Sequence, residues 1–253
     1  MTADRLARAA GFEKKEVKTT SFLLTSFYRI EAPGAPVTVY IEGDGLAWLS
    51  KTRLSTDPTP RHPVALELAR KDSETPNVVY LARPCQYTLH SQDPLCADAS
   101  YWSNKRFSET VISSMNEAVD YFKSQSNAKE LHFIGYSGGA AVAALIAARR
   151  EDVKSLRTVA GNLDPEAVNR THKVSPLSGS LNPMDAAQKL KGLPQRHFIG
   201  SADETIPEFI ARGFAAKTGG RACANVTSVD GASHQNGWTG RWPELLAIPV
   251  ECK

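Results

Sequence analysis

Long hydrophobic runs are missing from this sequence. The longest uninterrupted apolar stretch runs from Ala140 to Ala148, far short of the roughly 20 residues that a membrane-spanning helix needs. A run of this length is typical of a helix buried in a protein core. We therefore expect a chain without a transmembrane segment.

The sequence also lacks a large excess of charge of one sign, and it lacks clusters of basic residues. The 253 residues include 30 basic and 27 acidic side chains, and no basic block or alternation of basic and aromatic residues occurs. A nucleic-acid-binding surface needs such a pattern, so we expect no nucleic acid as partner. With 42% hydrophobic and 23% charged residues, the composition is that of an ordinary globular protein.

Cysteine is scarce, and its spacing is wrong for zinc. None of the four cysteines lies in a Cys-x-x-Cys pair or at ligand spacing from histidines, so no metal site is expected. Cys85 and Cys96 bracket a short polar segment that a disulfide could close. Cys223 and Cys252 would then join the C-terminal tail to the last predicted strand. Four reduced thiols are the alternative.

The first residues lack the pattern of an export signal, since the chain opens with polar and charged residues such as Thr2, Asp4 and Arg5. Two disulfides, in contrast, would indicate an oxidising compartment. We expect a periplasmic or secreted protein whose export signal is not present in this sequence. A cytoplasmic protein is the alternative.

Short runs of β-branched and aromatic residues alternate with helical patterns. This alternation predicts an α/β fold, with a mainly parallel central sheet flanked by helices. A hairpin or meander is expected over about residues 16–30, followed by buried strands at 37–42, 77–82, 131–136, 156–161 and 196–201 and by a further strand at 225–230. Helices are expected at 108–124, 138–150, 207–217 and 243–246. Residues 162–194 are the least regular and are expected to form a small or minimal cap. We expect one domain over residues 1–253.

The segment Gly135-Tyr136-Ser137-Gly138-Gly139 is the first candidate for chemistry. It matches Gly-x-Ser-x-Gly, with a predicted strand before it and a predicted helix after it. In this context the serine sits in a strained turn that exposes its hydroxyl, and the amides at the start of the helix face a site where an oxyanion would form. A glycine-rich turn between two core elements is the alternative.

A serine hydroxyl is a poor nucleophile unless a base takes its proton and a third group orients that base. Asp203 in "FIGSADETIP" and His234 in "VDGASHQNGW" each follow a predicted strand. Loops at the carboxyl ends of parallel strands converge on one crevice, so both side chains can reach Ser137. Asp164, after the strand at 156–161, is a rival for the acid, and we place Asp203 ahead of it.

With these motifs, the chain resembles the α/β-hydrolase superfamily from about Val37 to its C-terminus, and within it bacterial exported members of unassigned substrate. The resemblance implies an α/β-hydrolase fold. It also implies that Ser137 is the nucleophile, that His234 is the general base and then the general acid, and that Asp203 orients the imidazole.

The resemblance further implies two backbone donors to an oxyanion. One is the amide of Gly138, directly after the nucleophile. The second comes from the loop after the strand at 37–42, where many members begin with His-Gly and this chain has Glu42-Gly43-Asp44-Gly45. We prefer the amide of Asp44, with Gly45 as the next choice. The Asp44 carboxylate is expected to be turned away from the site or hydrogen-bonded.

Four aromatic residues near these motifs are candidates to line a substrate pocket, with packing in the core as the alternative. They are Tyr136, Tyr87, Trp102 and Trp238.

The sequence thus predicts a serine hydrolase that cleaves a small-molecule carboxylic ester through an acyl-enzyme on Ser137. No metal or organic cofactor is required for this chemistry. Acyl transfer is favoured over phosphoryl transfer because no glycine-rich phosphate loop with a lysine is present. Peptidase, thioesterase and lactonase activities share the same residues and remain open, as does the oligomeric state. A noncatalytic binding or scaffold protein of the same fold is the alternative from another class.

Overall fold

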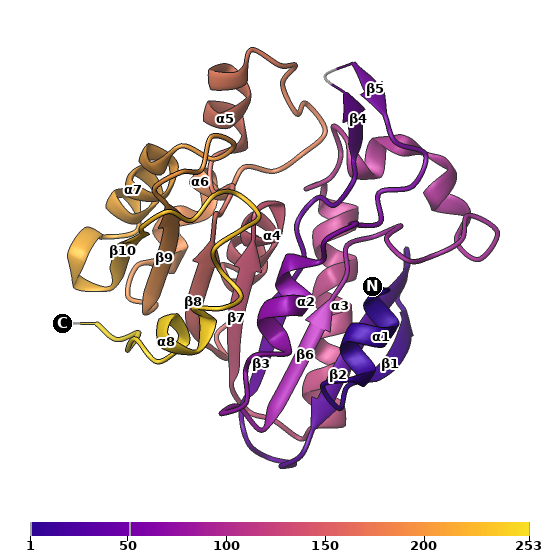
Figure 1. Ribbon diagram of the computed structural model, residues 1–253, viewed down its shortest axis with the longest axis horizontal. Helices are drawn as coiled ribbons and strands as arrows, with labels where there is room; N and C mark the ends of the chain where they lie inside the picture. The colour runs from indigo at the N-terminus through magenta and orange to yellow at the C-terminus, as the bar shows by residue number, and fades with distance from the viewer. Residues whose placement is uncertain (1, 51, 253) are drawn as a thin grey trace.

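A computed structural model of the chain describes residues 2–50 and 52–252. In these ranges one eight-stranded sheet runs through the molecule in the order β1-β2-β6-β3-β7-β8-β9-β10, as Figure 1 shows. The strands are β1 (Glu13–Lys18), β2 (Leu23–Ile30), β3 (Val37–Ile41), β6 (Asn77–Leu81), β7 (Leu131–Tyr136), β8 (Val153–Val159), β9 (Gln195–Gly200) and β10 (Ala224–Val229).

Six of these strands are parallel, from β6 across to β10, and β1 and β2 add an antiparallel hairpin at one edge. β3 and β6 are buried along their whole lengths because helices cover both faces of the sheet. Apart from Thr38 in β3 and Asn77 at the start of β6, they consist of valine, tyrosine, leucine and isoleucine, which suit such buried strands. The predicted α/β class with a mainly parallel sheet is confirmed.

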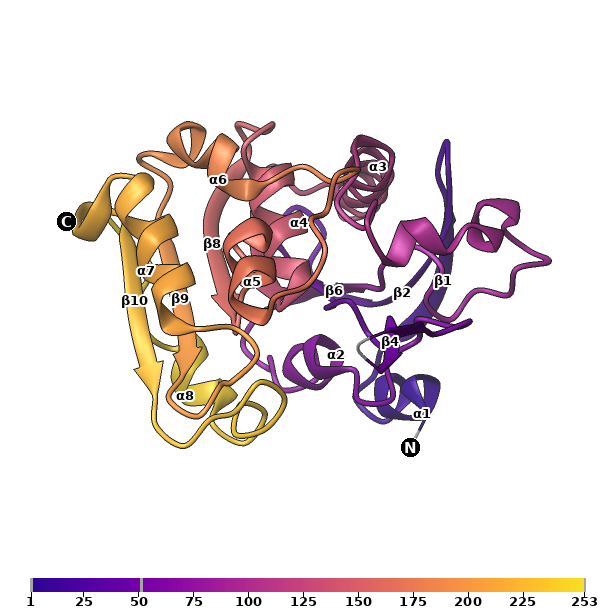
Figure 2. The same ribbon diagram turned by 90° about the horizontal axis from the view of Figure 1, so that it is seen from above.

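Two hydrophobic clusters lie on opposite faces of the sheet. One is formed with α3 (Glu109–Gln125), α4 (Gly138–Ala147) and α7 (Glu208–Lys217), and the other with α1 (Ala3–Arg8), α2 (Val64–Ala69) and α8 (Trp242–Leu246). Figure 2 shows the two helical layers on either side of the strands. The small side chains of α4 let it pack against β7 and β8, and this helix is buried over all its residues.

Several short elements were not expected from the sequence. They are α1, α2, the small hairpin β4 (Trp48–Ser50) and β5 (Arg53–Leu54), and the short helices η1 (Pro94–Ala97), η2 (Ala99–Trp102) and η4 (Gly220–Ala222). Each of these elements has at most six residues, so it is too short to show a hydrophobic period in the sequence.

Residues 162–194, expected to be irregular, contain α5 (Pro165–His172), α6 (Pro183–Ala186) and η3 (Ala187–Leu190). α5 forms because Asp164 caps it, accepting a hydrogen bond from the amide of Ala167, and because Pro165 occupies the first helical position. Residues 173–182 between α5 and α6 remain irregular.

Candidate active site

Ser137 lies in the sharp turn between β7 and α4, at the carboxyl end of a central strand. Its backbone has φ 50° and ψ −120°, a strained conformation for a residue with a side chain. Two backbone hydrogen bonds to the end of β8 and the segment after it hold the turn. The Ser137 amide donates to the Val159 carbonyl at 3.0 Å, and the Ser137 carbonyl accepts from the Asn162 amide at 2.9 Å. A Cβ on Gly135 would lie 2.5 Å from the Cα of Ala140, so only glycine lets the helix cross this closely.

His234 lies in the loop after β10 and reaches both other members of the predicted triad. Its Nε2 is 3.0 Å from Oγ of Ser137, and its Nδ1 is 3.0 Å from Oδ2 of Asp203. The three residues come from loops after β7, β9 and β10, and they meet because these parallel strands end at the same edge of the sheet.

The Asp203 carboxylate is fixed by its own loop. Its side chain is 1% exposed, and Oδ1 accepts hydrogen bonds from the amides of Thr205 at 2.8 Å and Ile206 at 2.9 Å. This arrangement leaves Oδ2 for the imidazole. An ionised carboxylate that only accepts hydrogen bonds requires the proton of the neutral ring to be on Nδ1, which leaves a lone pair on Nε2 toward the serine.

Asp164, the rival acid, has a different role. Its Oδ1 accepts from the amide of Ala167 at 3.1 Å and from Nδ2 of Asn182 at 3.2 Å. It therefore caps α5 and ties this helix to the segment before α6, while His234 pairs with Asp203.

The loop Glu42-Gly43-Asp44 after β3 lies directly against the serine turn. A Cβ on Gly43 would lie 3.1 Å from Cβ of Ser137, and a Cβ on Gly138 would lie 2.0 Å from Oδ1 of Asp44. The Asp44 carboxylate thus lies beside the serine turn, and its Oδ1 accepts a hydrogen bond from Nη1 of Arg83. Gly45 faces elsewhere, since a Cβ there would lie 2.0 Å from the carbonyl oxygen of Pro58.

Two arginines hold the Asp44 carboxylate in this place. Nη1 of Arg83 is 3.3 Å from Oδ1, and Nε of Arg106 is 3.1 Å from Oδ2. Burial lowers the pKa of Arg83 to about 10, and the nearby charge of Asp44 opposes that shift. The acidic side chain beside the serine is thus offset by two guanidinium groups. Sequence reasoning missed both arginines, which carry no local motif.

Glu42, which stands where many resembling proteins have histidine, is buried under the same loop. Its Oε1 accepts from the amide of Gly43 at 2.9 Å, and its Oε2 accepts from the hydroxyl of Tyr80 at 3.2 Å. Burial raises the pKa of the Glu42 carboxyl to about 7. The Glu42 side chain therefore supports the loop through these hydrogen bonds and does not face the serine.

The expectation that four aromatic residues line a pocket needs correction. Trp238 is 0% exposed, and its Nε1 donates to the carbonyl oxygens of Ser233 at 2.9 Å and His234 at 3.1 Å. The Tyr136 hydroxyl donates to the same His234 oxygen at 3.1 Å. Both rings therefore support the histidine loop from inside the protein, because a buried ring with its polar atom bonded has no face left for a ligand.

The other two aromatic residues also pack into the protein. Trp102 is 5% exposed and donates from Nε1 to the carbonyl of Ser55 at 3.1 Å. Tyr87 packs edge-on against Phe27, with ring centroids 6.5 Å apart, and burial raises its pKa well above the usual range. Trp102 is therefore buried in the core, whereas Tyr87 is half-buried and stays a candidate to line a pocket.

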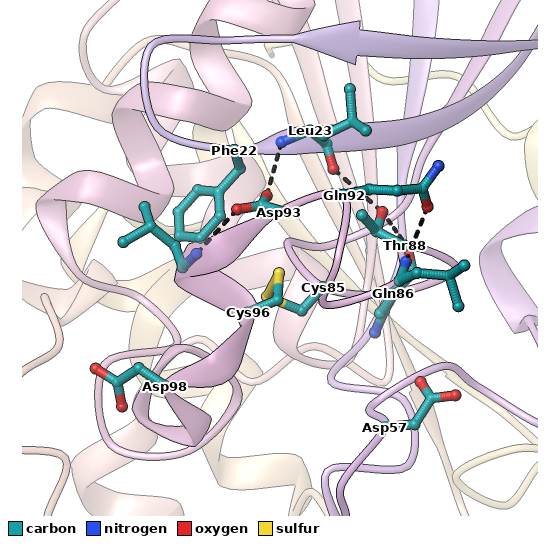
Figure 3. Close-up of a disulfide and its surroundings, with 12 residues drawn as sticks. Phe22, Leu23, Asp57, Cys85, Gln86, Thr88, Gln92, Asp93, Cys96 and Asp98 are labelled. Carbon is teal, nitrogen blue, oxygen red and sulfur yellow. Dashed lines mark hydrogen bonds between the residues drawn. A yellow bond between two sulfur atoms is a disulfide. The ribbon is translucent and has the colours of Figure 1, made fainter.

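The four cysteines pair as expected. Cys85 bonds to Cys96 and Cys223 bonds to Cys252, with Cα atoms 5.3 and 4.1 Å apart. Figure 3 shows the first disulfide and the loop that it closes. This loop is pinned to the start of β2, since Oδ2 of Asp93 accepts from the Leu23 amide at 2.8 Å and the Thr88 hydroxyl donates to the Leu23 carbonyl at 3.2 Å.

A cavity of about 490 Å³ lies elsewhere, between α4, α5 and α6. Its lining includes Leu145, Pro165, Leu181 and Lys189, and none of the three triad candidates belongs to it. The candidate site is therefore located by the geometry of Ser137, His234 and Asp203, not by the volume of a cavity.

Residues 2–50 and 52–252 show neither a cluster of metal-binding side chains nor a membrane-spanning helix. No group of three or more histidine, cysteine, aspartate or glutamate side chains there is arranged to hold a metal ion. Within the same ranges, each helix is too short or too polar to cross a membrane.

No protein-family model and no curated protein matches the chain. Solved structures do match it over nearly its whole length. Est1E from Butyrivibrio proteoclasticus, solved with ferulic acid bound, is 14% identical, with 92% of this chain and 97% of that chain covered and a TM-score of 0.65. The esterase Pf2001 from Pyrococcus furiosus is 14% identical, with 94% and 93% covered and a TM-score of 0.62.

A third solved structure is XC6422 from Xanthomonas campestris, described as an α/β serine hydrolase without lid. It is 14% identical, with 92% of this chain and 89% of that chain covered and a TM-score of 0.56. At this level of identity the likeness concerns the fold. Together with the parallel sheet and the turn between β7 and α4, it shows that the chain has the α/β-hydrolase fold.

Proposed function

We propose that the protein is a serine hydrolase that cleaves carboxylic esters through an acyl-enzyme. The observation that carries the proposal is the position of the His234 ring, which lies 3.0 Å from the Ser137 hydroxyl on one side and 3.0 Å from the Asp203 carboxylate on the other. This is the hydrogen-bonded chain that activates a serine.

In the acylation step, Nε2 of His234 takes the proton from Ser137 as Oγ attacks the ester carbonyl carbon. Asp203 stabilises the resulting imidazolium and keeps it oriented. The imidazolium then gives its proton to the leaving alcohol, and the C–O bond of the ester breaks. Water enters, and His234 takes a proton from it as its oxygen attacks the acyl carbon. The imidazolium then gives this proton to Oγ of Ser137 as the acyl C–Oγ bond breaks, which releases the acid and regenerates the serine.

The tetrahedral oxyanion needs two donors. The Gly138 amide is at the first position of α4, where helix N–H groups have no partner within the helix. We assign the second donor to Asp44, because the Gly43–Asp44 segment lies against the serine turn while Gly45 packs against Pro58.

An ester is favoured as substrate because the solved structure of Pf2001 with the same fold is named an esterase. Peptidase, thioesterase and lactonase activities use the same residues and are distinguished by the substrates tested. The first test is labelling with a fluorophosphonate probe, followed by hydrolysis of p-nitrophenyl esters of graded acyl length. We expect labelling and turnover in the wild type, and a loss of turnover by roughly six powers of ten in Ser137→Ala.

Ser124→Ala is the matched control, since this exposed serine is on α3 and outside the candidate site. Equal labelling of wild type and Ser137→Ala, or no labelling of either, would favour the noncatalytic scaffold.

We also propose that the protein works in an oxidising compartment, the periplasm or the cell exterior. The support is the pairing of all four cysteines into two disulfides. Intact-mass measurement of freshly purified, unreduced protein tests this. A mass 4 Da below that of the reduced chain, about 1 Da for each thiol proton lost, is expected, and four free thiols would contradict it.

A further inference from the structure

The peptide unit between Gly43 and Asp44 is held by a hydrogen bond on its carbonyl side. Its carbonyl oxygen accepts a hydrogen bond from Nε2 of Gln86 at 3.0 Å. The peptide is trans, like the other described peptides of the chain, so its C=O and its N–H point in opposite directions. Fixing the Gly43 carbonyl toward Gln86 therefore aims the Asp44 N–H away from Gln86.

The Asp44 N–H donates none of the hydrogen bonds found within residues 2–50 and 52–252, so it has no acceptor there. The loop that carries it lies against Ser137 and Gly138. An amide donor without a protein partner next to a reactive serine is what an oxyanion site requires.

Gln86 itself cannot rotate its amide. Its side chain is buried, with the residue 1% exposed, and Oε1 accepts from the Arg83 amide at 3.0 Å while Nε2 donates to Gly43. An N–H group can only donate and a carbonyl can only accept, so these two partners determine which end of the amide is oxygen. The side chain is thus a rigid link between the 83–86 turn and the Gly43 carbonyl.

The backbone on both sides of Gln86 is constrained as well. Cys85 and Tyr87 have φ values of 69° and 60°, in the left-handed region that residues with side chains rarely adopt. The Cys85–Cys96 disulfide holds one side, and the Tyr87 amide donates to the Thr59 hydroxyl at 2.8 Å on the other. Figure 3 shows Gln86 beside the disulfide.

We infer that Gln86 is a positioning residue for catalysis: it holds the Gly43 carbonyl so that the Asp44 amide faces the oxyanion formed at Ser137. This inference rests on the proposed serine hydrolase function and adds to it a residue that contacts no substrate. It also explains why a strained, disulfide-bonded turn lies next to the loop after β3.

The test compares two Gln86 variants with a matched glutamine in the same disulfide loop. Gln86→Met removes the donor and the acceptor. Gln86→Glu keeps the shape and the acceptor for Arg83 but, when ionised, has no proton for Gly43. Gln92→Met is the control, because the exposed Gln92 side chain accepts only from the nearby Leu89 amide at 3.1 Å.

We expect kcat for a p-nitrophenyl ester to fall about 10- to 100-fold in both Gln86 variants, somewhat less than the roughly 10²–10³-fold loss when an oxyanion donor is removed outright. KM should stay within about threefold, because the interaction is made in the transition state. The inhibition constant of phenylboronic acid, which forms a tetrahedral adduct with the serine, should rise in parallel with the loss of kcat. Gln92→Met should match the wild type in all three quantities.

A kcat within about twofold of wild type in Gln86→Met, or a loss confined to KM, would overturn the inference. Thermal unfolding identifies a variant that does not fold, and the other variant then decides. Failure of the proposed function is recognised separately, since the wild type would then show neither Ser137 labelling nor ester turnover. If the wild type is active and the Gln86 variants equal it, only the positioning role fails.

Discussion

The hydroxyl of Tyr136 donates a hydrogen bond to the backbone carbonyl of His234 at 3.1 Å. Tyr136 is the last residue of β7 and directly precedes the proposed nucleophile, so this bond joins the strand that leads to the serine to the loop that carries the proposed base. The Tyr136 ring also lies 5.5 Å from the His234 ring, centroid to centroid. Serine and histidine are therefore held together by their neighbours as well as by their own contact.

Tyr136→Phe keeps the ring and removes this bond. We expect the free energy of unfolding to fall by about 1 kcal/mol. We also expect kcat to fall by roughly three- to tenfold, on the order of 1 kcal/mol in the barrier, because the base is less well positioned. Trp238 still holds the same carbonyl, so the loop does not collapse. Urea unfolding and ester hydrolysis measure the two effects.

Tyr28→Phe is the control for this variant. Its hydroxyl donates to Glu13 at 2.8 Å at the surface, on the opposite edge of the sheet. We expect Tyr28→Phe to leave kcat unchanged. If Tyr136→Phe also keeps full kcat, the bond to His234 has no part in positioning the base.

The buried Glu42 carboxyl makes stability depend on pH. Its pKa is raised from 4.5 to about 7 by burial. Because the folded-state pKa lies above that of the unfolded chain, the contribution of Glu42 to stability is fully present below pH 4.5 and is lost as the pH rises through about 7. Glu42→Gln, which stays neutral, should remove this dependence.

Between pH 4 and pH 8 we expect the free energy of unfolding of the wild type to fall by on the order of 3 kcal/mol relative to that of Glu42→Gln. Urea unfolding at several pH values measures it. Glu151→Gln changes an exposed glutamate and should run parallel to the wild type. Parallel curves for Glu42→Gln would show that Glu42 does not titrate abnormally.

Gly138→Ala should disturb the loop after β3. The added Cβ would lie 2.0 Å from Oδ1 of Asp44, so the carboxylate must leave its position and loosen its contacts with Arg83 and Arg106. We expect a loss of stability of about 2 kcal/mol or more and a loss of kcat, since the Asp44 backbone moves with the side chain. Chemical unfolding and ester turnover test both.

Gly213→Ala is the opposite case. Gly213 lies inside α7, and a Cβ there would meet nothing within 4 Å. Alanine should stabilise this helix by about 0.5–1 kcal/mol without any change in kcat. A Gly138→Ala variant that behaves like Gly213→Ala would contradict the tight approach of Asp44 to the serine turn.

The two disulfides should differ in their effect on catalysis. Removing either pair by serine substitution should cost about 3 kcal/mol of stability, since the bonds close segments with sequence separations of 11 and 29 residues. Only Cys85→Ser with Cys96→Ser should also lower kcat, because Cys85 adjoins Gln86. The Cys223 and Cys252 pair is the matched control. Equal kcat in both double variants would mean that the first disulfide has no link to the reaction.

Much of the fold could be read from the sequence. Apolar strand patterns predicted six of the eight sheet strands individually, and the hairpin or meander expected at about 16–30 covers β2 and the second half of β1. The elements that were missed, such as α1, α2 and the β4–β5 hairpin, are too short to show a period and form through contacts with the rest of the molecule. The order Ser137, Asp203, His234 in the chain was likewise visible, because each residue lies at the end of a predicted strand or in the loop after one.

What the sequence by itself determined was therefore local: strand and helix periods, the strained Gly-x-Ser-x-Gly turn and the loops that could supply a base and an acid. Only the tertiary structure decided which side chains support them. Gln86 and the Gly43 carbonyl are 43 residues apart, and Arg83 and Asp44 are 39 residues apart. Such pairs leave no periodic signal, since they meet only when parallel strands align their carboxyl ends. Trp238 and Tyr136 show the same limit: a pattern marks an aromatic residue near a site, but only packing decides whether its face is free or buried.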